Sequence, residues 1–202
     1  MLQVVLMTRS PRYSLVAIAL HWTIAIAIFV MLAAGLWMTD AIKQPDTRNF
    51  AFKVYQWHKA LGLTILVLTL VRIGWRLANP PPPPPASMTG FEKTASGLAH
   101  AGLYALMLAL PLAGWAMVSA SPLGFPTMIF GLFEWPHVPM LAELEDKKSA
   151  EAVFKSMHKY LAYGAIALIG LHVAAALKHH FVNRDDVLAR MVPGSRKHPA
   201  NG

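Results

Sequence analysis

The stretch from Phe154 to Phe181, FKSMHKYLAYGAIALIGLHVAAALKHHF, decides the fold. It is an apolar run at least as long as the roughly 20 residues that an α-helix needs to cross the hydrocarbon core of a bilayer. It also carries two histidines, His158 and His172, which lie fourteen residues apart. At about 100° per residue, fourteen steps return to within roughly 40° of the same helix face and advance about 21 Å along the axis. We therefore expect a membrane helix that presents one imidazole in each leaflet, both on one face.

Three further apolar runs have the length of membrane helices. They cover residues 15–38, 54–77 and 98–120. Hydrophobic residues make up 55% of the chain and charged residues only 14%, which is too few charges to cover a soluble domain. The first run is too long for a signal peptide and lacks a small-residue cleavage site. The sequence predicts an all-α, integral membrane four-helix bundle that forms a single domain over residues 1–202.

The connections between these runs differ in character. A short polar loop covers residues 39–53, a proline-rich loop covers residues 78–96, and a longer loop covers residues 121–153. Six consecutive prolines, 80–85, must form polyproline II and end the second helix. A stiff spacer is favoured there over a recognition motif. The aromatic run in the longer loop is expected to lie in the membrane interface.

The charges indicate an orientation and the absent cysteines exclude several cofactors. Ten of the eighteen Lys and Arg residues lie on the side of the two termini, and seven of the ten acidic residues lie on the other side. By the positive-inside rule, both termini are expected to be cytoplasmic. The chain has no cysteine, which excludes disulfides, iron–sulfur clusters and covalently attached c-type haem.

The histidines of the predicted helices fall into pairs of matching depth. His21 lies near the inner end of its helix, level with His172, and His58 begins the second helix from the outside, level with His158. An ionisable side chain is costly in lipid and is therefore a functional candidate. Two neutral imidazoles on one iron are b-type haem ligation and leave no open position for oxygen chemistry. The sequence predicts two haem b groups that carry single electrons across the membrane.

The fourteen-residue step also relates other residues to helix histidines. Three residues lie fourteen positions after such a histidine: Gly35, Arg72 and Gly114. A glycine on the haem-facing stripe would let the macrocycle approach the backbone, and an arginine there could pair with a propionate. Close helix packing for the glycines and snorkelling for the arginine are equally open alternatives.

Two lysines directly follow predicted ligands at the outer rim. Lys59 follows His58 and Lys159 follows His158. Their ammonium groups could bind propionates or steer a small anionic reductant toward the outer haem. The alternative is that they anchor helix ends at lipid headgroups.

The remaining membrane histidine, His100, has no iron partner left. It could form a proton-handling or quinone-binding pocket with Tyr104, one turn further along the helix, although a structural hydrogen bond is at least as plausible. His179 and His180 follow at the inner end of the fourth helix, where cationic groups complement the helix dipole. They are interpreted as solvated or propionate-contacting residues.

Several stretches resemble the bacterial cytochrome b561 family over nearly the whole chain. The matching residues are His21-Trp22, His58 with Gly62 and Arg72, Met88-Thr89-Gly90 leading to Gly97-Leu98-Ala99-His100, Ala109-Leu110-Pro111, and Gly170-Leu171-His172 with Ala174-Ala175-Ala176 leading to His179-His180. The resemblance implies a four-helix di-haem protein of the bacterial inner membrane. It implies that the axial ligands are His21, His58, His158 and His172, the same four that spacing selects. It also implies electron exchange with ubiquinone and, as in one member, oxidation of superoxide at the periplasmic face.

Three functions follow as competing hypotheses. The leading one is an oxidoreductase that takes electrons from superoxide or another one-electron donor outside and reduces ubiquinone. The second is a haem-carrying membrane anchor for a partner dehydrogenase or hydrogenase, which the long outer loop would favour. The third, a histidine-lined proton or metal transporter, predicts no haem and does not explain histidine pairs matched in depth.

Overall fold

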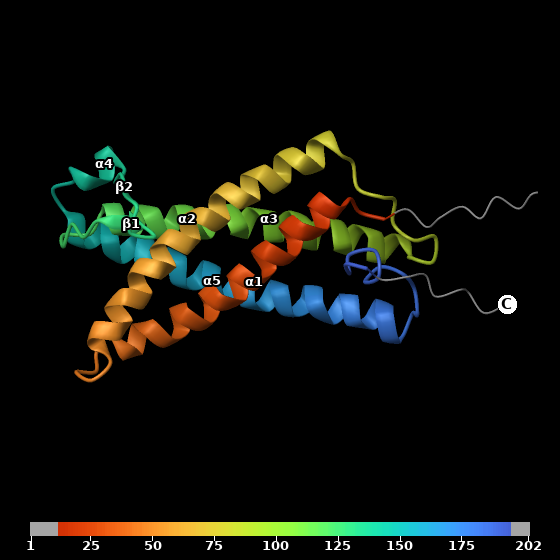
Figure 1. Cartoon of the computed structure of the whole chain (residues 1–202), viewed down its shortest axis with the longest axis horizontal. Helices are drawn as coiled ribbons and strands as arrows, with labels where there is room; N and C mark the ends of the chain where they lie inside the picture. The colour runs from red at the N-terminus through yellow and green to blue at the C-terminus, as the bar shows by residue number, and fades with distance from the viewer. Residues whose placement is uncertain (1–11, 195–202) are drawn as a thin grey trace, which may run out of the picture.

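Four long helices run the length of the molecule. The structure is a computed structural model that describes residues 12–194. The helices that are long and apolar enough to cross a membrane within that range are α1 (Leu15–Ala41), α2 (Arg48–Ala78), α3 (Gly90–Ser119) and α5 (Lys147–Phe181). Figure 1 shows them as an elongated bundle in which both ends of the described chain lie at the same end. The predicted all-α membrane bundle is confirmed, and the predicted orientation across the membrane stays a prediction.

Three helices begin six to eight residues earlier than their apolar runs suggest, because their first turns are polar; side chains cap two of them, α3 and α5, but not α2. Thr89 caps α3: its hydroxyl accepts the Glu92 N–H at 3.2 Å, and the Glu92 carboxylate accepts the Thr89 N–H at 2.9 Å. Asp146 caps α5 by accepting from Ser149, and hydrogen bonds from the Ser149 side chain and backbone hold the pKa of Asp146 below its usual range. The proline-rich connection therefore shrinks to residues 79–89.

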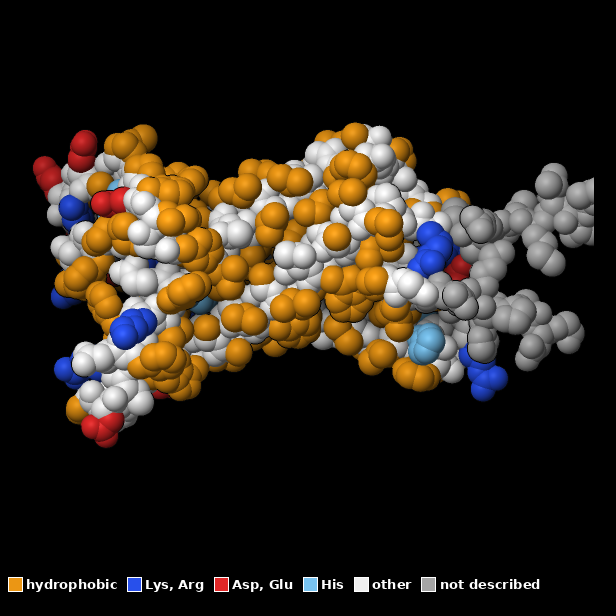
Figure 2. All heavy atoms as spheres, viewed as in Figure 1, with side chains coloured by type: hydrophobic (Ala, Val, Ile, Leu, Met, Phe, Trp, Pro, Cys, Tyr) orange, Lys and Arg blue, Asp and Glu red, His pale blue; other side chains and the backbone are white. Residues whose placement is uncertain are grey.

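The helices pack through small side chains and turn their large apolar side chains outward. α1 packs along α2, α3 packs along α5, and α2 also contacts α3. Alanines are buried in the bundle: Ala51, Ala60, Ala113, Ala120 and Ala165. Leu171 is 67% exposed and Phe29 55%, and apolar side chains cover the middle of the visible face (Figure 2). This inside-out distribution is what a bilayer as solvent requires.

The connection between α3 and α5 is folded, which the sequence did not predict. Strand β1 (Thr127–Ile129) pairs antiparallel with β2 (Phe133–Trp135), and a short helix, α4 (Pro139–Ala142), follows. At the hairpin tip, Phe130 and Gly131 have φ angles of 51° and 78°, the left-handed conformation of a tight turn. The hairpin lies against α2 (Figure 1). The aromatic loop is thus packed on the bundle.

Residues 182–194, here called the terminal strap, cross the end of the bundle where the described chain begins. The Arg12 guanidinium donates to the Val192 carbonyl at 2.8 Å, and the Arg190 guanidinium donates to the Pro83 carbonyl at 2.7 Å. The strap is therefore tied both to the segment before α1 and to the proline-rich connection.

Candidate functional site

The first imidazole pair joins the two ends of the sequence. His21 comes from α1 and His172 from α5, and their ring centres lie 6.3 Å apart with an angle of 68° between the ring planes. The two imidazoles meet here although 151 positions separate the residues in sequence. The pairing expected from helix depth is the one that the structure brings together.

The second imidazole pair has nearly the same geometry. His58 of α2 and His158 of α5 also have ring centres 6.3 Å apart, with 70° between the planes. Because α5 is continuous from Lys147 to Phe181, the α5 members of the two pairs lie about 21 Å apart along one rigid axis. One helix therefore contributes one imidazole to each pair.

The residues present fit a b-type haem at each pair. With metal–nitrogen bonds of about 2 Å, imidazoles on opposite sides of one iron have ring centres roughly 6 Å apart, which is the separation observed in both pairs. His158 Nδ1 lies 2.9 Å from the Leu110 carbonyl oxygen, and such a bond orients a metal-binding imidazole and leaves its other nitrogen for the metal. His58 Nδ1 is buried without a hydrogen-bond partner among the described residues. Residues 12–194 contain no group of three or more His, Asp or Glu that could hold a bare metal ion.

Two of the predicted glycines lie against the second pair. A Cβ atom added to Gly35 would lie 3.3 Å from His58 Cε1. One added to Gly114 would lie 3.2 Å from Cε1 and 3.3 Å from Nδ1 of His158. Their absent side chains thus leave room for the imidazoles themselves, and contact with a macrocycle stays a prediction.

His100 lies beside the first pair and makes its contacts there. Its ring centre is 5.3 Å from that of His172, and its Nδ1 lies 2.7 Å from the Ser96 carbonyl oxygen. Among the described residues, no hydrogen bond or ring contact joins His100 to Tyr104, and the Tyr104 hydroxyl accepts from Arg72 Nε at 3.0 Å. The structural hydrogen bond considered for His100 is therefore present.

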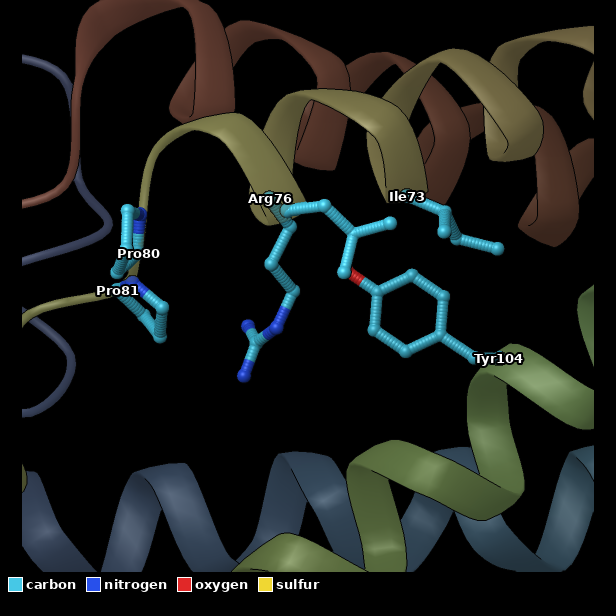
Figure 3. A pocket seen from close by; sticks show the side chains of 6 residues that line it. Ile73, Arg76, Pro80, Pro81 and Tyr104 are labelled. Carbon is cyan, nitrogen blue, oxygen red and sulfur yellow. The ribbon is translucent and has the colours of Figure 1, made fainter.

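Tyr104 and two arginines form a basic group near the first pair. The guanidinium carbons of Arg72 and Arg76 lie 5.9 and 6.0 Å from the centre of the Tyr104 ring. A cavity of about 390 Å³ opens beside them, lined by Ile73, Arg76, Leu77, Pro80, Pro81 and Tyr104. In Figure 3 the Arg76 side chain and the Tyr104 ring both extend from their helices toward this space. The cavity combines apolar walls with a guanidinium and a phenol.

The two rim lysines have different partners. Lys59 Nζ donates to the Pro126 carbonyl of the hairpin connection at 2.6 Å. Lys159 Nζ lies 5.9 Å from the centre of the Tyr163 ring on its own helix. Lys59 therefore also fastens the hairpin, and a shared role for both lysines toward an anion stays a prediction.

Sequence reasoning missed the backbone carbonyls that orient the histidines. The Leu110 and Ser96 carbonyls carry no side-chain signal. Pro111, inside α3, does not point to them either, because a proline in a helix frees the carbonyl four residues before it, here that of Met107.

Fold and geometry together define a class: a multi-pass membrane protein whose helices hold two facing imidazole pairs suited to haem. The sequence profile of the prokaryotic cytochrome b561 family matches residues 12–194. The chain belongs to this family, and it is a transmembrane haem b electron-transfer protein of the bacterial inner membrane.

Three relatives extend the match over most of the chain. Cytochrome b561 homolog 2 of Escherichia coli is 33% identical, covering 92% of this chain and 94% of its own. The "probable superoxide oxidase" of Yersinia pestis is 34% identical, covering 92% and 98%. Cytochrome b562 of Cereibacter sphaeroides is 32% identical, also covering 92% and 98%.

Proposed function

We propose that the chain holds two haem b groups, one between His21 and His172 and one between His58 and His158. The observation that carries this proposal is the pair of 6.3 Å ring separations, with both α5 imidazoles on one helix. Each bound haem supplies one-electron oxidation and reduction. The protein's part is to hold the imidazoles, exclude water and fix the distance between the two sites.

The proposed reaction is oxidation of superoxide outside the membrane and reduction of ubiquinone. Two superoxide anions each give up one electron and become dioxygen, and ubiquinone takes up the two electrons and two protons to become ubiquinol. The name of the Yersinia pestis relative supports this donor. So does the position of Lys59 and Lys159 directly after the second-pair ligands, because cationic side chains attract a small anion.

The cavity beside Tyr104 is the proposed quinone site. Its aliphatic and proline walls suit a quinone ring with an isoprenoid tail, and Arg76 offers N–H donors for a carbonyl oxygen of the ring. It lies near the first pair, because Arg72 joins the Tyr104 hydroxyl to the Ala17 carbonyl, one helical turn before His21. The proposed orientation places this end of the bundle in the cytoplasm.

The packing of the outer connection favours this function over a membrane anchor for a partner dehydrogenase or hydrogenase. The Phe125 ring contacts Phe52, and the Phe130 ring contacts Trp57, with ring centres 5.3 and 5.5 Å apart. These contacts and the Lys59 hydrogen bond use the connection to cover the chain's own helix α2. An anchor would be expected to keep it available for the partner.

Haem content of ligand variants tests the ligation. Purified protein should hold two haem b per chain in a pyridine haemochrome assay. His172→Ala and His158→Ala should each lower this to one, because each removes one axial ligand. His137→Ala, in the outer connection, is the matched control and should retain two. Two haems surviving in either ligand variant would refute the assignment.

Superoxide and quinone turnover test the substrates. The haems of the wild-type protein should be reduced by superoxide, and added ubiquinone should reoxidise them. Tyr104→Phe should raise the KM for quinone several-fold while leaving reduction by superoxide unchanged. A protein with two haems that superoxide does not reduce would instead support the anchor function.

A further inference from the structure

Trp22 links a predicted iron ligand to the terminal strap. It follows His21 directly, and the two ring centres lie 5.3 Å apart with the planes crossed at 72°. The indole N–H of Trp22 donates to the Met191 carbonyl at 2.7 Å. This bond joins residues 169 positions apart in the sequence, from α1 to the strap beyond α5.

The His21 imidazole is held differently from two of the other membrane histidines, His100 and His158. His158 and His100 are each fixed by a ring nitrogen near a backbone carbonyl, those of Leu110 and Ser96. For His21 the described contacts are the rings of His172 and Trp22. A metal-bound imidazole needs a second contact to fix its rotation about the metal–nitrogen bond. For His21, the Trp22 ring is the described ring contact from its own helix.

The strap carbonyl that receives the indole N–H is itself held in place. The Arg12 guanidinium donates to the carbonyls of Ala189 at 3.2 Å and Val192 at 2.8 Å, on either side of Met191. Arg190 donates to the Pro83 carbonyl at 2.7 Å. The acceptor for Trp22 is therefore fixed at three points to other parts of the bundle.

We propose that Trp22 is a positioning residue for the first haem: its hydrogen bond to Met191 sets the rotation of the His21 imidazole and couples the docking of the terminal strap to that site. The proposal rests on His21 being an iron ligand. The angle between two axial imidazole planes sets the splitting of the iron d orbitals, so rotation of one ring changes the electron paramagnetic resonance spectrum of that haem alone.

Trp22→Phe tests the proposal, because it keeps an aromatic edge and removes the N–H donor. We expect the largest g value and the midpoint potential of one haem to shift while those of the other haem stay unchanged and two haems are retained. Trp37→Phe is the matched control on the same helix: the Trp37 ring packs on Phe50 toward the other end, and neither haem should change. Arg12→Gln, which loosens the strap, should shift the same signal in the same direction by a smaller amount.

The outcomes separate this proposal from the proposed function. If His21→Ala leaves two low-spin haem signals, the ligand assignment itself fails. If His21→Ala removes one signal and Trp22→Phe leaves the remaining spectra superimposable on wild type, the positioning role alone is refuted. A shift in Trp37→Phe equal to that in Trp22→Phe also refutes it. Should Trp22→Phe lose haem, Arg12→Gln decides, and an unchanged spectrum there overturns the coupling.

Discussion

Gly114 lies so close to the His158 imidazole of the second pair that a larger side chain would collide with the ring. An alanine Cβ would lie 3.2 Å from His158 Cε1, closer than ordinary contact, and the bond from Nδ1 to Leu110 limits how far the ring can move. We expect Gly114→Ala to lower the occupancy of one haem and to shift its midpoint potential, measured by haem-to-protein ratio and redox titration. Gly97→Ala, on the same helix with nothing within 4 Å, should retain wild-type values. Equal losses in both variants would mean that helix propensity, not contact, is responsible.

Lys159 is the cleaner test of electrostatic steering, because Lys59 also fastens the hairpin. Lys159→Met should lower the rate constant for haem reduction by superoxide several-fold and weaken its dependence on ionic strength, since steering of a small anion is screened by salt. Stopped-flow reduction at two salt concentrations measures both effects. Lys147→Met removes a charge twelve residues away, about 18 Å along the helix, and should change the rate much less. An unchanged rate constant in Lys159→Met would show that Lys159 does not attract superoxide to the haem.

At the scale of elements, the capping box stabilises the first turn of α3. This turn is polar, so burial in the bilayer does not stabilise it. Thr89→Val removes the hydroxyl that accepts the Glu92 N–H and should cost about 1 kcal/mol of unfolding free energy. Titration with sodium dodecyl sulfate, followed by circular dichroism, measures the change. Thr94→Val, which removes a hydroxyl bonded only to the Gly90 carbonyl within the helix, should cost clearly less. Equal costs would show that the cap contributes no more than any first-turn hydroxyl.

The sequence predicts features that depend on neighbouring residues better than features that depend on contacts between residues far apart in the chain. The apolar runs were sufficient to predict four helices, and the depths of His21, His58, His158 and His172 in those helices were sufficient to predict which imidazoles face each other. Helix starts were misplaced because a hydropathy window detects lipid contact and not capping, as at Thr89. The β hairpin was missed because three-residue strands leave no periodicity. Trp22 donates to a backbone carbonyl, that of Met191, which lies far away in the sequence. No local sequence pattern encodes such a contact.

At the scale of the whole molecule, the absence of cysteine makes the orientation directly measurable. Leu132→Cys places a thiol on the hairpin at a site that is 80% exposed, and Arg184→Cys places one on the terminal strap. With the hairpin outside, a membrane-impermeant thiol reagent should label Leu132→Cys in intact spheroplasts and label Arg184→Cys only after permeabilisation. The wild-type chain is the control and should take up no label. The reverse pattern would invert the proposed direction of electron flow.

Helix α5 is the last of the membrane helices within residues 12–194, and it contributes an imidazole to both pairs. During synthesis, α1 and α2 enter the membrane with His21 and His58 while neither has its partner. Neither pair is complete until α5 has left the ribosome, so we expect both sites to become able to bind haem at nearly the same moment. We expect chains that stop before α5 to insert three helices and carry no haem. If these histidines bind haem, their order along the chain ties cofactor binding to the insertion of α5.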